Sequence, residues 1–143
     1  MSQATYLGGS IRKQSLPVIE GRPGPDAPNL KRIRLAQGEL SQIHNSGEAI
    51  RYLAALELRA GAVRGNHYHK IKEEFIYVIE GELLIAAADM DSAERASISL
   101  EAGDLCVIQP GIAHALRTVR AGQALEFSPA PFDPSDQYPF SLG

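Results

Sequence analysis

The feature that most constrains the fold of this chain is a series of short apolar runs separated by turn-forming residues. No stretch places apolar residues at helical spacing over three capped turns. Gly, Pro or Asn follows most of the runs, as is typical of strands that end in tight turns. The runs are Ile33–Leu35, Leu40–Ile43, Ile50–Leu58, Phe75–Ile79, Leu83–Ala87, Ala96–Leu100, Leu105–Ile108 and Ala115–Val119. Many short strands at regular spacing indicate a sandwich or barrel, so we predict an all-β fold.

Length and proline content divide the chain into three parts. Its 143 residues suffice for one domain with a single core. Residues 17–28 contain four prolines and two glycines, a composition that breaks both helices and sheets. We therefore predict an N-terminal arm and loop over residues 1–30, a β-barrel over residues 31–128 and an extended, proline-rich tail over residues 129–143.

Charge is distributed unevenly along the chain. The formal net charge is −3, which disfavours nucleic acid as a partner because phosphate binding needs a basic surface. Residues 1–35 carry six basic and two acidic side chains, a charge of +4, whereas residues 36–143 carry eight basic and fifteen acidic ones, a charge of −7. The basic segment is therefore a candidate for binding a neighbouring subunit or an anionic ligand. The alternative is that these charges only form a solvated surface.

Signals for a membrane or for export are missing from the sequence. The longest uncharged apolar stretch, Leu83–Ala88, is far shorter than the roughly 20 residues that a membrane helix needs. The first fifteen residues contain no apolar run that could serve as the core of a signal peptide. A lone cysteine, Cys106, excludes an intramolecular disulfide and suits a reducing compartment. We expect a cytoplasmic protein with no membrane partner.

Three of the four histidines lie in two short stretches of the sequence. His67 and His69 are two residues apart, so in a strand both imidazoles point to the same face. A turn then leads into a strand that begins with two glutamates, Glu73 and Glu74. In the second stretch, a Pro-Gly turn precedes His114. Imidazole and carboxylate groups gathered in this way indicate a metal site.

These two stretches resemble the two sequence motifs of the cupin family. The first reads Gly61, five residues, His67-x-His69, four residues, Glu74, six residues and Gly81. The second reads Gly103-Asp104, then Pro110-Gly111, two residues and His114. The second stretch departs from the family pattern at Gln109, where proline often stands, and at Thr118, where asparagine is usual.

The resemblance implies both a fold and a metal site. The fold is the cupin double-stranded β-helix, which is a jelly-roll barrel. The ligands implied for one divalent metal ion per chain are His67, His69, Glu74 and His114, and such a set suits Zn, Fe, Mn or Ni. Glu73 is the rival to Glu74, but the spacing to the following glycine favours Glu74. Some cupins have an empty site or use their histidines as acid-base groups without metal, which is the alternative to metal binding.

Other polar residues near the motifs are weaker candidates for the site. Arg64, Lys70 and Arg117 flank the ligand strands and could bind a substrate carboxylate or phosphate. His44 lies outside the motifs and is a fourth candidate for binding substrate. For all four residues the alternative is a structural or exposed role. Cys106 is expected in the core, with no flanking cation to make it reactive.

The family resemblance does not decide the reaction, because cupins include isomerases, dioxygenases, decarboxylases, lyases and binding proteins. Short patches around His67 and in the C-terminal tail are similar to small bacterial cupins linked to sugar-nucleotide and surface-polysaccharide biosynthesis. We hypothesise a metal-dependent isomerase or epimerase that acts on a small polar, oxygen-rich molecule such as a sugar derivative. The alternatives are an Fe-dependent dioxygenase and a protein that binds a small ligand without catalysis.

The run Phe75–Ile79 is apolar at every position, although a sheet face turned to water should alternate apolar with polar residues. If Glu74 faces the barrel interior, then Phe75, Tyr77 and Ile79 face outward and form an apolar patch that needs a cover. The cover is either the chain's own N-terminal arm or a second subunit. We predict a homodimer that exchanges its basic arm.

Overall fold

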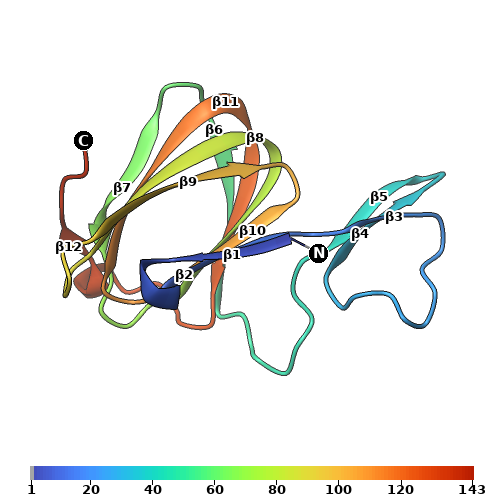
Figure 1. The fold of residues 1–143 in the computed structure, drawn as a ribbon, viewed down its shortest axis with the longest axis horizontal. Helices are drawn as coiled ribbons and strands as arrows, with labels where there is room; N and C mark the ends of the chain where they lie inside the picture. The colour runs from blue at the N-terminus through green and yellow to red at the C-terminus, as the bar shows by residue number, and fades with distance from the viewer. Residues whose placement is uncertain (1) are drawn as a thin grey trace.

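The computed structural model describes residues 2–143, and its regular structure is almost entirely β-strand (Figure 1). The strands are β1 (Ser2–Tyr6), β2 (Ile11–Ser15), β3 (Val18–Glu20), β4 (Lys31–Leu35), β5 (Gly38–Gln42), β6 (Tyr52–Leu58), β7 (Val63–Tyr68), β8 (Glu74–Asp89), β9 (Arg95–Glu101), β10 (Asp104–Ile108), β11 (Ile112–Ser128) and β12 (Tyr138–Pro139). The two short 3-10 helices are η1 (Leu7–Gly9) and η2 (Pro134–Asp136). Within residues 2–143, no helix is long and apolar enough to cross a membrane. The all-β prediction is confirmed.

Two long strands, β8 and β11, organise the barrel. They contain 16 and 17 residues and pair with each other antiparallel along most of their length. β8 pairs with β10 in its first half and with β9 in its second half. β11 likewise pairs first with β7 and then with β6. Because each long strand has different neighbours in its two halves, the nine-stranded sheet curls into the predicted jelly-roll barrel.

Glycines allow both long strands to bend where the barrel turns a corner. Gly81 has a φ of +99° within β8, and the register between β8 and β11 shifts beside it. A Cβ atom on Gly122 of β11 would lie 1.9 Å from the carbonyl oxygen of Glu80. The sequence predicted a turn at Glu80-Gly81 between two separate strands. The structure has one bent strand instead, because pairing with β11 continues on both sides of the glycine.

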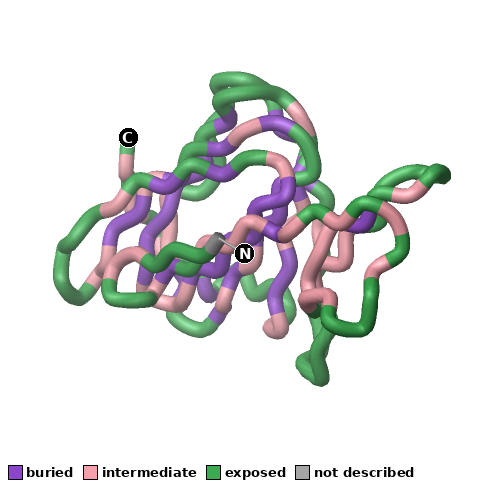
Figure 2. Tube along the Cα trace, turned by 45° about the vertical axis from the view of Figure 1, so that its right-hand side comes forward, coloured by how far each residue is buried: buried purple, intermediate pink, exposed green. Residues whose placement is uncertain are grey.

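Aliphatic side chains fill the interior of the barrel. On β8, Ile76, Val78, Leu83 and Ile85 are each no more than 1 % exposed. They pack with inward-facing residues of neighbouring strands such as Ile108. Figure 2 shows this burial running along the barrel strands, while the connecting loops are exposed. The buried positions of these strands coincide with the apolar runs from which the strands were predicted.

The N-terminal region differs from the predicted arm. β1 pairs with β2, and β2 pairs with β10, so residues 2–15 extend the barrel sheet. β3, β4 and β5 instead form a separate three-stranded sheet that projects from the barrel on the right of Figure 1. Residues 31–42 thus lie outside the barrel sheet. The polar sequence of β2 gave no strand signal, because β2 is defined by its pairing with β10 and buries only Ile11 among its side chains.

The outward-facing apolar patch is covered in part by the chain itself, since Ile79 remains 46 % exposed. Tyr77 is 2 % exposed and lies in a second apolar cluster with Leu16, Leu105 and Phe127. Other side chains packed against this cluster come from the barrel and from the segment that carries the projecting sheet: Leu30, Ile43 and Phe75. The first of the two predicted covers is therefore present within one chain. The homodimer stays a prediction.

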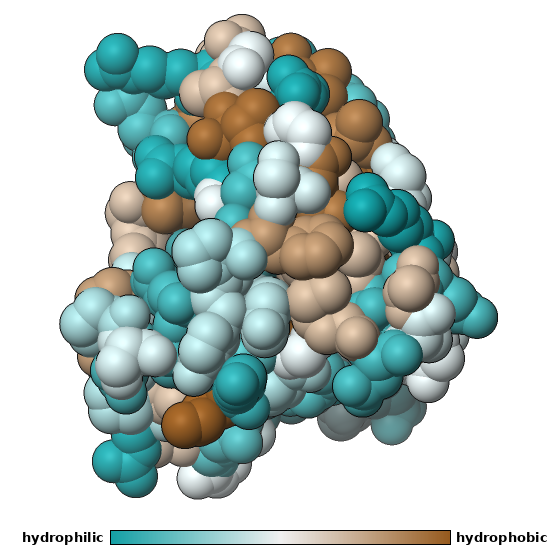
Figure 3. Space-filling view, turned by 90° about the vertical axis from the view of Figure 1, so that its left-hand side faces the viewer, coloured by the Kyte–Doolittle hydropathy of each residue, from teal (hydrophilic) through white to brown (hydrophobic). Residues whose placement is uncertain are grey.

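The tail after β11 returns along the barrel to β7. β12 pairs with the end of β7, and Phe140 donates its backbone N–H to the carbonyl of Asn66 at 2.9 Å. The ring of Tyr138 stacks on that of Tyr68, with 5.2 Å between centroids. Figure 3 shows this side of the molecule, where hydrophilic side chains dominate the lower part and apolar ones gather towards the top. The tail is therefore hydrogen-bonded to the barrel through β7.

The second apolar cluster generates a stability prediction. Phe127→Ala should lower the free energy of unfolding by about 3–5 kcal/mol, because it removes a buried aromatic ring and leaves a cavity. Leu53→Ala is the matched control, since Leu53 is the cross-strand partner of Phe127 and is 64 % exposed. Chemical denaturation measures both variants. Equal losses of stability would contradict the assignment of Phe127 to a core.

Candidate functional site

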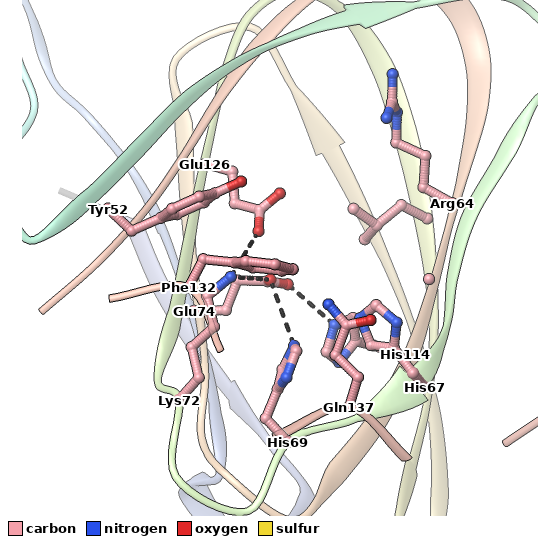
Figure 4. Close-up of a pocket in the computed structure, with 12 residues that line it drawn as sticks. Tyr52, Arg64, His67, His69, Lys72, Glu74, His114, Glu126, Phe132 and Gln137 are labelled. Carbon is pink, nitrogen blue, oxygen red and sulfur yellow. Dashed lines mark hydrogen bonds and ion pairs between the residues drawn. The ribbon is translucent and has the colours of Figure 1, made fainter. Parts of the chain in front are cut away.

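The structure brings together the four residues that the sequence assigned to a metal site (Figure 4). His67 lies on β7, and His69 follows the end of that strand. Glu74 begins β8, and His114 on β11 is the cross-strand partner of His67. One ring nitrogen from each of the three histidines lies within 4.8 Å of the others. Glu74 places Oε2 at 2.9 Å from His114 Nε2 and Oε1 at 3.8 Å from His69 Nε2.

A glycine allows the two histidine strands to approach each other. Gly65 has a φ of +94°, and a Cβ atom there would lie 2.6 Å from the carbonyl oxygen of His114. The next residue, Asn66, also has a positive φ, +59°. β11 has a register irregularity at His114/Ala115, directly opposite this part of β7. The local backbone therefore re-aims His67 and His114 towards one point.

Backbone carbonyls determine the tautomers of two of the histidines. His69 Nδ1 lies 2.7 Å from the carbonyl oxygen of Asp136, and His114 Nδ1 lies 3.0 Å from that of Ile112. A carbonyl oxygen only accepts hydrogen bonds, so in the neutral ring Nδ1 carries the proton. Nε2 of each ring is then a lone-pair donor that faces the cluster. This is the arrangement in which histidines ligate metals.

The atoms at the centre of the cluster lack hydrogen-bond partners. Among the buried side-chain nitrogen and oxygen atoms of residues 3–143, only His69 Nε2, Glu74 Oε2 and His114 Nε2 have none. His114 Nε2 and Glu74 Oε2 lie 2.9 Å apart, a contact that is a hydrogen bond only when one of the two groups carries a proton. Two lone pairs facing each other at this distance need a cation or a proton between them. Three imidazole nitrogens and one carboxylate are a suitable donor set for a divalent transition metal.

The charges in the cluster support the same conclusion. Burial disfavours the Glu74 anion, but His114 and Lys72 lower the pKa of this carboxyl below its usual range. Burial also disfavours the His114 cation, but Glu74 raises the pKa of that ring above its usual value. Without a metal, Glu74 therefore favours a proton on the His114 ring. Burial and the two neighbouring histidines lower the pKa of His67 to about 4, so His67 is neutral at pH 7.

A buried lysine and a second glutamate extend the cluster. Lys72 is 6 % exposed, and its Nζ lies 2.9 Å from Glu126 Oε1, 3.4 Å from Glu74 Oε1 and 4.5 Å from the ring centroid of Tyr52. Burial would lower the pKa of Lys72, but the two glutamates raise it, so the side chain remains an ammonium. Burial and the charge of Glu74 raise the pKa of Glu126 to about 7.

These groups line a cavity of about 220 Å³. Its wall consists of Tyr52, Arg64, Gly65, His67, His69, Lys72, Glu74, His114, Leu116, Glu126, Phe132 and Gln137. Figure 4 shows the histidines and Glu74 gathered at one side of the cavity and Glu126 beyond Lys72. Phe132 and Gln137 belong to the C-terminal tail. The cavity therefore places an acid-base group and a candidate metal site within reach of one small molecule.

A family model described as Cupin domain matches residues 55–128, more than half of the chain. The chain belongs to the cupin family. No curated protein matches the sequence of this cupin significantly.

Several solved structures resemble the cupin at low sequence identity. A dTDP-4-dehydrorhamnose 3,5-epimerase from Sulfolobus tokodaii has a TM-score of 0.74 and 19 % identity, covering 96 % of this chain and 80 % of its own. A 3'-monoepimerase from Streptomyces bikiniensis in complex with dTDP-quinovose has a TM-score of 0.75 and 11 % identity, covering 97 % and 74 %. A TDP-quinovose 3,4-ketoisomerase from Campylobacter jejuni has a TM-score of 0.67 and 20 % identity, covering 77 % and 88 %. At these identities the likeness concerns the fold.

Of the four weaker candidates, the structure brings only Arg64 to the cavity wall. Lys70 is exposed and lies over the ring of Tyr138, which is not part of the wall. Arg117 lines a separate groove on the outside of the barrel, because it alternates with the inward-facing Leu116. His44 packs edge-on against the ring of Phe127, which belongs to the second apolar cluster.

The structure separates the two glutamates at the start of β8. Glu74 is 3 % exposed and belongs to the histidine cluster, whereas Glu73 Oε2 accepts a hydrogen bond from Gln109 at 2.6 Å. Cys106 is fully buried, as expected for a core residue, and burial raises the pKa of its thiol to about 12. The thiol is therefore unreactive at neutral pH.

The sequence interpretation missed Lys72 and Glu126 as cavity residues. In the sequence, Lys72 stands near a turn with three other charged residues, Lys70, Glu73 and Glu74. Such a context normally indicates solvent exposure. Glu126 was missed because it alternates with the apolar Leu125 and Phe127, a pattern that predicts an outward-facing glutamate. In the structure Glu126 shares its face with Ala124 and Ser128, which are both buried completely.

The raised pKa of Glu126 generates a testable prediction. In the metal-free protein, one glutamate carboxyl should change from acid to carboxylate as the pH rises through about 7, and its signal should be absent from Glu126→Gln. Carbon-13 NMR of the carboxyl groups measures this titration. Glu39, whose pKa Arg32 lowers to about 2, is an internal reference at the other extreme. Titration of every glutamate below about pH 5 would contradict the described environment.

Proposed function

We propose that this cupin is a metal-dependent isomerase or epimerase that acts on a small carbonyl-containing sugar derivative. The observation that carries the proposal is a cavity in which unpartnered imidazole and carboxylate atoms converge beside a glutamate with a pKa near 7. The similar solved structures include epimerases and a ketoisomerase of TDP-linked sugars, which supports the reaction class.

The proposed metal ligands are the four residues of the cluster: His67, His69, Glu74 and His114. Zn, Fe, Mn and Ni are the candidate ions, since each accepts imidazole and carboxylate ligands. When bound, such an ion polarises a substrate oxygen and makes adjacent C–H and O–H bonds more acidic. Arg64 at the cavity wall would pair with a phosphate or carboxylate of the substrate.

Glu126 moves the proton in this proposal. A carboxyl with a pKa near 7 accepts and returns protons efficiently at neutral pH. Its carboxylate takes a proton from the carbon beside the substrate carbonyl. A proton returned to the opposite face of that carbon gives an epimer. A proton delivered to the former carbonyl carbon, as the neighbouring hydroxyl proton moves to the former carbonyl oxygen, gives the isomeric ketone. The product is therefore an isomer with unchanged composition. Lys72, at 2.9 Å, holds Glu126 in place and compensates its negative charge.

The proposed ligand set predicts that two neighbouring glutamates differ in their effect on metal affinity. Glu74→Gln should weaken Zn²⁺ binding by more than about tenfold, because it removes an anionic ligand from the centre of the cluster. Glu73→Gln is the matched control and should leave the affinity near that of the wild type, since Glu73 bonds to Gln109. Titration calorimetry with Zn²⁺ measures both. Equal effects, or full metal content in a His67→Ala/His114→Ala double variant, would contradict the metal site.

Proton exchange tests the reaction class. We expect the metal-loaded protein to replace the C–H protons beside the carbonyl of dTDP-4-dehydrorhamnose with deuterium in D₂O, as followed by proton NMR. Glu126→Gln should slow this exchange at least about a hundredfold, whereas Glu94→Gln on the surface should not. A related sugar nucleotide without a carbonyl controls for background exchange.

Two other outcomes of these experiments would overturn the isomerase proposal. Binding of the sugar nucleotides without any exchange would indicate a binding protein. Oxygen consumption by the Fe-loaded protein, without exchange, would indicate a dioxygenase.

A further inference from the structure

One aspartate of the C-terminal tail connects two parts of the site that are distant from it in sequence. Asp136 ends helix η2 and is 6 % exposed. Its carboxylate accepts backbone hydrogen bonds from three successive residues: Lys70 N at 2.8 Å, Ile71 N at 3.2 Å and Lys72 N at 3.0 Å. Successive N–H groups that converge in this way form an anion-binding nest, occupied here by a side chain of the same protein.

The turn that Asp136 holds connects β7 to β8 and lies between two of the proposed metal ligands. His69 precedes the turn and Glu74 follows it, and Lys72 extends from the turn into the cavity. Burial opposes ionisation of Asp136, but the three backbone N–H groups lower the pKa of its carboxyl, so the nest holds a full negative charge. Charge-assisted hydrogen bonds of this kind are shorter and stronger than neutral ones.

The backbone of the same residue reaches the site directly. The carbonyl oxygen of Asp136 lies 2.7 Å from His69 Nδ1. The carboxylate thus fixes the position of η2 relative to the turn, and the carbonyl fixes the proton on His69 Nδ1. The side chain that follows, Gln137, and the earlier tail residue Phe132 complete the cavity wall.

We propose that Asp136 is a positioning residue, through which the C-terminal tail sets the tautomer and orientation of His69 and the placement of Lys72. The tail is then a required component of the site, although neither the cupin motifs nor the matched family region reaches it. The predicted effect of Asp136 on metal affinity rests on the proposed function, whereas its predicted effect on the His69 tautomer does not.

The role of Asp136 can be separated from simple anchoring of the tail. Beyond η2, the tail is held independently, since β12 pairs with β7 and Leu142 N donates to Asn66 Oδ1 at 2.8 Å. Loss of the Asp136 carboxylate should therefore leave the tail attached while it releases the turn. This makes Asp136→Asn and Asp136→Ala informative variants.

The variants should form a graded series in two measurements. In metal-free protein, nitrogen-15 NMR should show His69 protonated at Nδ1 in the wild type, with a growing share of the Nε2–H form in Asp136→Asn and then Asp136→Ala. Zn²⁺ affinity should fall in the same order, by about 10–100-fold overall, the usual effect of removing a group that orients a metal ligand.

Asp104→Asn is the matched control. Asp104 is also 6 % exposed and also accepts a backbone hydrogen bond, from Glu101 N at 2.8 Å, together with one from Ser15 Oγ at 2.7 Å. Its replacement should lower thermal stability and leave the His69 tautomer and the Zn²⁺ affinity unchanged.

Three results would overturn the role of Asp136. These are an unchanged tautomer and affinity in Asp136→Ala, an equal loss of affinity in Asp104→Asn, and a wild-type His69 protonated at Nε2. The last measurement needs no variant and holds even if the variants do not fold. Absence of Zn²⁺ binding by the wild type would contradict the metal proposal and leave the tautomer series as the test of Asp136.

Discussion

The rest of the site depends on how the buried carboxylate of Glu74 is neutralised. One of its oxygens lies near Lys72 Nζ and His69 Nε2, and the other lies 2.9 Å from His114 Nε2. A buried carboxylate without compensation would cost several kcal/mol, roughly the effective penalty for desolvating an ion. Lys72 compensates one side only. The backbone carbonyls that hold the histidine tautomers leave the other side lined with lone pairs, which favours a cation there.

Burial and the nearby Glu74 carboxylate together raise the pKa of Glu126. Lys72 lies between the two glutamates, so one ammonium faces two carboxyl groups. Glu74 is held as the anion by its additional contact with His114, and Glu126 consequently has the raised pKa of the pair. Two carboxyl groups whose environments push their pKa values apart can perform different tasks. In the proposed function, Glu74 binds the metal and Glu126 exchanges protons.

Much of the fold and of the cluster could be predicted from the sequence because their signals are local. Short apolar runs between glycines specify strands, and the spacing of His67 and His69 places both rings on one face. The long bent strands β8 and β11 could not be derived in this way, because pairing across the barrel overrides the turn signal at Gly81. Lys72 was missed for a similar reason, since long-range pairing with Glu126 buries a residue whose neighbours indicate solvent.

The contribution of Asp136 shows why fold similarity alone cannot assign chemistry to this cupin. The barrel supplies strands that bring the histidines together, and the epimerase and ketoisomerase structures have a similar fold at no more than 20 % identity. The orientation of His69, however, depends on a carbonyl outside the matched region, held by a carboxylate that binds three backbone N–H groups. Tail residues also form part of the cavity wall. In the proposed function, the chemistry of the site therefore depends on the junction between the barrel and its C-terminal tail as well as on the barrel strands that carry the histidines.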